Sequence, residues 1–297
     1  MKLRTAEAGK KRGRFPVRCV ILDFDGTLTD VEKEAAGFGE RYLLDLCSVL
    51  GIAEAELGRL WEAERRKLDE SPDFGWSVGG KIVAPAYADP HILATATAGA
   101  VLDSLGLFMD KAERLKLSDS IFHRNYPLNP TVFRDGAGEF LRELMDKFPV
   151  FIVTSSEAGN VERKLAQLGP GRAPPVFGSA QKYAIDDSWA AVPEGMEVGG
   201  LGRPVLLRRK KYWEIIEGIL ASAGVSRGEA LVAGDIFELD LSLPLFMGVP
   251  VCLVMKGATG IYEIDAVSGY ERGIVAPDLQ GVLSSLAPGS WNISMKR

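Results

Sequence analysis

Short apolar runs recur along the chain and predict strands. They are rich in Val, Ile, Leu and Phe and lie at 17–24, 149–154, 231–234 and 249–255. Apolar residues occupy both alternating sets of positions, which is typical of parallel strands that are covered on both faces. We therefore expect a buried parallel sheet.

Helical patterns separate these runs. They lie at 137–147, 157–168 and 211–223, and the last two are followed by the stop signals Gly169-Pro170-Gly171 and Gly224. Strands that alternate with helices predict an α/β fold built on a doubly wound, Rossmann-like parallel sheet.

One long segment interrupts this alternation. Its helical patterns lie at 32–50, 53–70, 90–105 and 110–124, and the Gly- and Pro-rich stretch 74–89 between the second and third is expected to be a loop. We interpret 31–130 as an inserted, mostly helical domain and 17–30 with 131–297 as the α/β core. A second insertion, at about 170–208, is expected to form a small hairpin or an extended loop.

Charge and cysteine content narrow the possible partners. The net charge of −5 argues against nucleic-acid binding by the body of the protein, although the first 18 residues hold seven basic residues and one acid. Residues 1–16 are expected to be a disordered basic arm, and contact of this arm with nucleic acid or an anionic surface is the minority alternative. No apolar signal segment follows the arm, and the run 17–22 is too short to span a membrane. Three scattered cysteines are typical of reduced thiols in a cytoplasmic protein.

Two carboxylates directly follow the first predicted strand. Asp23 and Asp25 are two positions apart, so they start on the same face of the strand, and Gly26 permits a sharp turn after them. Converging carboxylates make a hard oxygen site that suits Mg²⁺, and one of them could act as nucleophile while the other handles protons. The alternative is an Asp-rich turn in a solvated loop.

Two later strands also end in polar residues. The run 149–154 ends at Thr154, where a hydroxyl could donate to a phosphoryl oxygen, although Ser155 or Ser156 could simply cap a helix. The run 231–234 leads into Asp235, with Asp240 five residues later. Two acids on a surface loop are the alternative reading for that pair.

These motifs together resemble those of the haloacid dehalogenase-like (HAD) hydrolase superfamily. Asp23-Phe24-Asp25-Gly26-Thr27 is similar to its first motif, Thr154 matches its second, and Gly234-Asp235 with Asp240 resembles its Gly-Asp-x4-Asp metal motif. The resemblance implies that Asp23, the backbone carbonyl of Asp25 and Asp235 bind Mg²⁺, while Asp240 acts through water or holds its neighbours. It also implies that the helical insertion is a cap over the active site.

The superfamily also uses a lysine, which this sequence leaves ambiguous. Lys210 stands at about the expected distance before Gly224, with Lys211 beside it, but the Lys-Pro pair often seen there is absent. Lys182 is a competitor. One such cation is required because a phosphoryl group and several carboxylates leave excess negative charge.

The activity implied by the resemblance is a Mg²⁺-dependent phosphatase that acts on a small phosphorylated metabolite through an aspartyl-phosphate. A phosphomutase has the same motifs and remains an alternative. A dehalogenase is disfavoured, because its pattern lacks the second aspartate and the need for Mg²⁺. The alternative from another class is a non-catalytic binding protein with the same fold. The oligomeric state cannot be read from the sequence.

Overall fold

The computed structural model describes residues 16–169 and 171–286. These residues divide into two compact units. Asp30–Val132 forms one, and the described residues on either side of it form the other. The arm expected over residues 1–16 lies outside the described residues, apart from Pro16. None of the helices in the described ranges has both the length and the apolar character needed to cross a bilayer.

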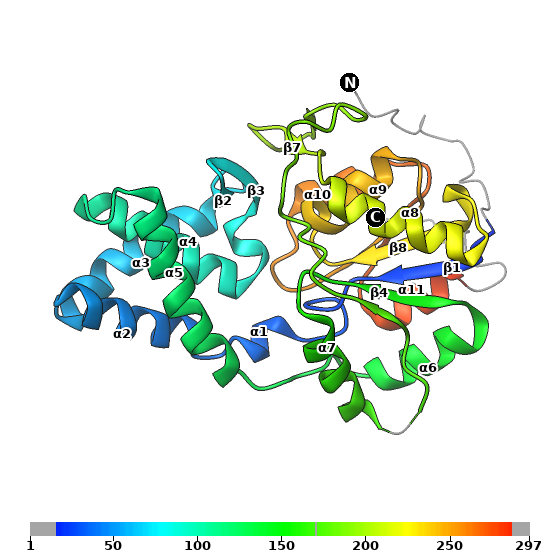
Figure 1. Cartoon of the computed structure of the whole chain (residues 1–297), viewed down its shortest axis with the longest axis horizontal. Helices are drawn as coiled ribbons and strands as arrows, with labels where there is room; N and C mark the ends of the chain where they lie inside the picture. The colour runs from blue at the N-terminus through cyan, green and yellow to red at the C-terminus, as the bar shows by residue number, and fades with distance from the viewer. Residues whose placement is uncertain (1–15, 170, 287–297) are drawn as a thin grey trace, which may run out of the picture. The chain divides into compact units, whose positions relative to one another are not determined.

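A six-stranded parallel sheet forms the centre of the α/β unit (Figure 1). Its strands, within the described residues, are β1 (Cys19–Leu22), β4 (Val150–Val153), β5 (Val176–Phe177), β8 (Ala230–Gly234), β9 (Val251–Val254) and β10 (Gly273–Ala276). The spatial order is β10-β9-β8-β1-β4-β5, and β1 pairs in parallel with both β4 and β8. The chain therefore builds the sheet outward from β1 in both directions, which confirms the predicted doubly wound α/β class.

Helices cover both faces of this sheet. They are α6 (Ala137–Lys147), α7 (Ala158–Leu165), α8 (Lys210–Ala223), α9 (Ser242–Phe246), α10 (Ile261–Ser268) and α11 (Leu279–Leu286). Apolar side chains of α6, α7 and α11 pack on one face, in a core shared with β1, β4 and β8 to β10, and α8 lies on the other (Figure 1). All four residues of β1 are buried, as two-sided coverage requires.

The Asp30–Val132 unit is mostly helical. It contains α1 (Val31–Glu34), α2 (Phe38–Leu50), α3 (Glu54–Glu70), α4 (Pro90–Leu105) and α5 (Lys111–Asn125). Its own apolar core includes Phe38, Tyr42 and Trp61, with side chains from α4 and α5. The first predicted helix is divided in two, because Gly37 adopts a φ of 77° between α1 and α2.

The prediction of a loop over 74–89 is wrong. The structure has an antiparallel hairpin there, β2 (Gly75–Val78) and β3 (Lys81–Pro85). Gly79 and Gly80 form its two-residue turn with φ values of 61° and 83°. Positive φ at both central residues is the geometry of a type I′ turn, whose twist matches that of paired strands.

The second insertion, predicted as a hairpin or an extended loop, contains both kinds of structure. Its short strands β6 (Gly195–Met196) and β7 (Val205–Leu206) pair in an antiparallel manner. The connection from β5 to β6 is extended and irregular. This connection matters for the site because it carries Lys182.

Candidate active site

The carboxyl ends of β1, β4 and β8 bring the sequence motifs together. Asp23 follows β1, Thr154 follows β4 and Asp235 follows β8. These three strands are adjacent in the sheet, and the order in which the chain adds strands reverses at β1, with β4 on one side and β8 on the other. Open parallel sheets bind ligands at such a switch point, outside the carboxyl ends of the strands.

The turn after β1 connects Asp23 with Asp235, the acid that follows β8. The hydroxyl of Thr27 lies 2.9 Å from Oδ2 of Asp23 and 3.1 Å from Oδ1 of Asp235, within hydrogen-bonding distance of both. Gly26 has a φ of 85°, and a Cβ atom there would lie 2.3 Å from Oδ2 of Asp235. Glycine is therefore required for both its backbone conformation and the close approach of the acid.

Three carboxylates converge at this point. One oxygen each from Asp23, Asp235 and Asp240 lies within 4.8 Å of the others, and all three residues are buried. A π-helical turn over Phe237–Leu241 brings Asp240 back towards the end of β8, where the Ile236 N–H donates to its Oδ2 at 3.0 Å. Buried carboxylate oxygens in this number suit a hard cation such as Mg²⁺.

The carboxylate of Asp25 has a different environment from the three converging carboxylates. Its carboxylate accepts hydrogen bonds from Thr154 Oγ1 at 3.1 Å and from Ser156 Oγ at 2.7 Å. The Lys164 ammonium lies 3.8 Å from its other oxygen. The structure therefore brings Asp25 and Thr154 together, and the Asp25 side chain does not belong to the group of three converging acids.

Lys182, and not Lys210, lies with the acids. The Lys182 ammonium is 2.5 Å from Oδ1 of Asp23 and 2.8 Å from Oδ1 of Asp240, and its side chain is only 4% exposed. Its backbone is fixed as well, because its N–H donates to Ser155 Oγ at 3.1 Å and its carbonyl accepts from the buried Arg209 guanidinium.

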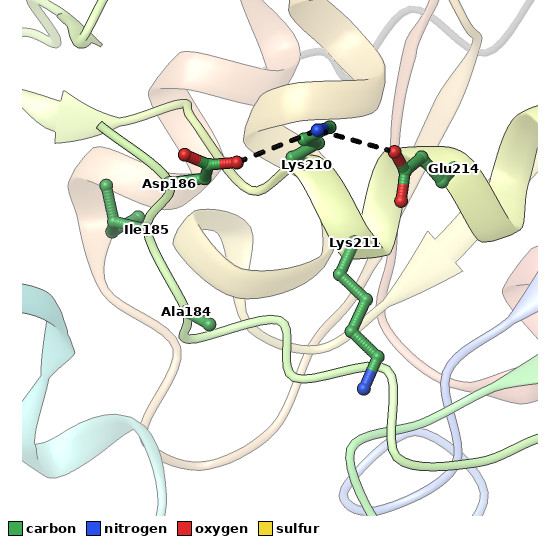
Figure 2. A pocket seen from close by; sticks show the side chains of 6 residues that line it. All are labelled: Ala184, Ile185, Asp186, Lys210, Lys211 and Glu214. Atoms are coloured by element: carbon green, nitrogen blue, oxygen red, sulfur yellow. Dashed lines mark ion pairs between the residues drawn. The ribbon is translucent and has the colours of Figure 1, made fainter. Parts of the chain in front are cut away.

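Lys210 instead lies at the surface, at the first turn of α8. Its side chain is 44% exposed, and its ammonium is 3.9 Å from both Asp186 and Glu214 (Figure 2). Lys210 and Lys211 both line a surface pocket (Figure 2). Both lysines belong to a helix that begins beyond the extended connection, whereas Lys182 lies within that connection. This difference decides which ammonium contacts Asp23.

Burial sets the ionisation of the site. It raises the pKa of Asp23, and the surrounding carboxylates act in the same direction, while the Lys182 ammonium opposes them. Burial also raises the pKa of Asp235, against the opposing effect of Lys256. Burial by itself would lower the pKa of Lys182, but Asp23 and Asp240 hold it above its usual range.

Two charged residues next to the site were not predicted. Lys256 follows β9, and its ammonium contacts Oδ2 of Asp235. Arg134 donates from Nε to the Gly26 carbonyl at 2.9 Å and from a terminal nitrogen to the Met255 carbonyl at 2.7 Å. The signal for Lys256 was present, because a charged residue just past an apolar strand is the pattern that identified Asp23 and Asp235.

Glu238 lies between Asp235 and Asp240 in the sequence, which alone did not assign it a role. It is fully buried, and both its oxygens accept hydrogen bonds from Arg203 at 2.8 Å. Tyr262 donates to the same carboxylate at 2.9 Å. This bidentate pair joins the second insertion to the segment that carries the acids.

The model of the haloacid dehalogenase-like hydrolase family matches residues 17–242. The chain belongs to this family. Membership of this hydrolase family identifies the protein as a HAD-like hydrolase. The matched range contains the two aspartates after β1, Thr154, Lys182 and the two aspartates after β8. No curated protein matches it in sequence.

Solved structures of other HAD-like proteins share the fold. A predicted phosphoglycolate phosphatase from Haemophilus somnus 129PT has a TM-score of 0.51 at 12% identity, with 93% of this chain and 100% of the other covered. A haloacid dehalogenase-like family protein from Streptococcus pneumoniae has a TM-score of 0.50 at 13% identity over 91% and 99%. At such identities the likeness shows the fold alone.

Proposed function

We propose that this HAD-like hydrolase is a Mg²⁺-dependent phosphatase that cleaves the monoester of a small phosphorylated metabolite. The observation that carries the proposal is the buried group of Asp23, Asp235 and Asp240, whose oxygens lie within 4.8 Å of one another. Lys182 contacts two of these acids. Acids and ammonium together form a centre that can accept an additional cation and an anionic phosphoryl group.

The donor set fits magnesium by its chemistry. Asp23, Asp235 and the backbone carbonyl of Asp25 would hold the ion, and Asp240 would act through water or orient its neighbours. When bound, Mg²⁺ would offset the charge of the phosphoryl group and orient it. Oxygen ligands alone, with no thiol or imidazole among the proposed ligands, are the preference of this hard cation.

The side chains around Asp23 support its role as the nucleophile. Lys182 holds Oδ1 and Thr27 holds Oδ2, so the carboxylate has a fixed orientation. In the proposed reaction a carboxylate oxygen of Asp23 attacks phosphorus in line, the P–O bond to the alcohol breaks, and an aspartyl-phosphate forms. Lys182 and Thr154 then bind the equatorial phosphoryl oxygens.

Asp25 is the proposed acid and base. It gives a proton to the departing alkoxide and later takes one from the water that hydrolyses the aspartyl-phosphate. Its carboxylate is half-buried and accepts hydrogen bonds from the hydroxyls of Thr154 and Ser156, which fix its orientation. This second acid, with Asp235, favours phosphate chemistry over dehalogenation, for which the nucleophile needs neither partner.

We also place the protein in the cytoplasm, because Cys19, Cys47 and Cys252 are free thiols.

The test is hydrolysis of an aryl phosphate with Mg²⁺, with EDTA, and by the Asp23→Asn variant. We expect activity that needs Mg²⁺ and falls by at least about a thousandfold in the variant, the order of loss seen when a nucleophile is removed. Asp146→Asn, at an exposed position of α6, is the matched control and should keep full activity.

Halide release from a 2-haloacid is measured in parallel. Halide release without phosphate release would reject the phosphatase proposal in favour of a dehalogenase. Full phosphatase activity in folded Asp23→Asn would reject the nucleophile. If the aryl ester is inert, a panel of natural phosphomonoesters is used, and failure of the whole panel would reject the proposal.

A further inference from the structure

The site contains a second buried lysine, on a different acid from the first. The ammonium of Lys256 contacts Oδ2 of Asp235, and its side chain is 6% exposed. A tight turn after β9 fixes its backbone: the Lys256 N–H donates to Thr259 Oγ1 at 2.8 Å, and its carbonyl accepts from the Thr259 N–H at 3.1 Å. The turn therefore fixes the backbone from which the Lys256 side chain reaches Asp235.

Lys256 and Lys182 contact different carboxylates of the group of three. Lys182 contacts Asp23 and Asp240, whereas Lys256 contacts Asp235. Each acid of the group thus has an ammonium in the described structure. Asp235 is the acid whose proposed role is metal binding alone, so an ammonium on it affects the metal rather than the nucleophile.

The contact makes the Lys256 ammonium and a divalent ion competitors for Oδ2 of Asp235. Oδ1 of Asp235 already accepts from Thr27 at 3.1 Å, and Oδ2 accepts from Lys256. Two cations on one buried carboxylate repel each other, and the repulsion is strong where water is excluded. A divalent ion at Asp235 therefore requires the ammonium to weaken or give up its contact with Oδ2.

We propose that Lys256 is a positioning residue that acts as the built-in counter-ion of Asp235 and lowers the affinity of the site for its divalent cation. The inference rests on the proposed function, because the metal belongs to it. In the absence of a divalent ion Lys256 stabilises a carboxylate whose burial would otherwise be costly. Metal binding is weakened by the free energy of that ion pair.

Isothermal titration with Mg²⁺ and Mn²⁺ tests the proposal on the full chain. Lys256→Met keeps the length of the side chain and removes its charge, so we expect its Kd for Mg²⁺ to fall at least tenfold. Lys256→Arg keeps the charge and should stay near the wild-type value. Lys164→Met is the matched control: Lys164 lies 3.8 Å from the Asp25 carboxylate, so its loss should change the Kd much less.

Thermal unfolding provides a second readout. In EDTA, Lys256→Met should have a lower Tm than wild type, and Mg²⁺ should raise its Tm by more than it raises that of wild type. Lys256→Gln keeps a neutral donor for Asp235 and should show an intermediate effect. It also serves as the test variant if Lys256→Met does not fold without metal.

The outcomes separate this inference from the proposed function. An unchanged or weaker Mg²⁺ affinity in both Lys256→Met and Lys256→Gln would overturn the inference, because Lys256 would then only orient Asp235. If wild type binds Mg²⁺ and Asp235→Asn does not, the metal site of the proposed function stands whatever Lys256 does. If wild type binds no divalent cation, both fail.

Discussion

A single ammonium contacts both the proposed nucleophile and Asp240, so the loss of Lys182 should affect activity and stability together. Lys182→Met leaves two buried carboxylates without their shared cation, which costs about 3–5 kcal/mol in comparable buried pairs. We expect phosphatase turnover to fall by at least about a hundredfold, as when one preorganised donor is removed. Urea unfolding and steady-state kinetics measure the two effects.

Lys210→Met is the control for this variant. Its long, exposed ion pairs are worth little, so the free energy of unfolding should change by less than about 0.5 kcal/mol and turnover should not change. A larger loss of activity in Lys210→Met than in Lys182→Met would reverse the assignment of the lysine.

The acids of the site could be predicted from the sequence, but the basic residues could not be assigned. Asp23 and Asp235 directly follow apolar strands, so their place at the sheet edge follows from the strand pattern. Lys182 comes from an irregular connection, whose path is set by tertiary contacts such as that between Arg209 and its carbonyl. Linear distance from the metal motif was therefore no guide to which lysine contacts Asp23.

At the scale of elements, the long helices and the strands β1, β4, β8 and β9 were predicted, whereas the core strands β5 and β10 were not. The strands predicted at 149–154 and 231–234 match β4 and β8 within a residue at each end. β5, with two residues, has too little periodicity to detect. The β2–β3 hairpin had a usable signal, the Gly79-Gly80 turn, but its glycines were interpreted as loop residues.

Gly75 gives a test of that hairpin. A Cβ atom at this position would lie 2.1 Å from the Ala84 carbonyl oxygen of the paired strand. We expect Gly75→Ala to lower the free energy of unfolding of the helical unit by about 1–3 kcal/mol, the usual cost of overpacking. Urea unfolding followed by far-UV circular dichroism measures it.

Gly99→Ala is the matched control. Gly99 is in the interior of α4, where a Cβ atom would meet nothing within 4 Å. Alanine there should stabilise by about 0.5–1 kcal/mol through helix propensity. Equal effects at the two positions would contradict the close pairing at Gly75.

At the scale of the whole molecule, the two units have separate apolar cores, and only one contains the acids. Calorimetry should therefore resolve two unfolding transitions. Mg²⁺ should raise the transition of the α/β unit, because a ligand stabilises the part that binds it, and EDTA should reverse the shift. Asp235→Asn should abolish the shift. A single transition that moves as a whole would contradict this independence.

The ends of the helical unit lie side by side, and this affects how the sheet is assembled. The Asp30 N–H donates to the Val132 carbonyl at 2.8 Å, and Thr29 and Phe133 form an isolated bridge. β1 and β4 are neighbours in the sheet but lie more than a hundred residues apart in sequence, so pairing them in an unfolded chain closes a long loop. Once the helical unit has folded, the flexible part of that loop is about fivefold shorter, which lowers the entropic cost of closure by roughly 1.4 kcal/mol. The insertion is made before β4 during synthesis, so by folding first it can reduce the conformational search that joins β1 to β4.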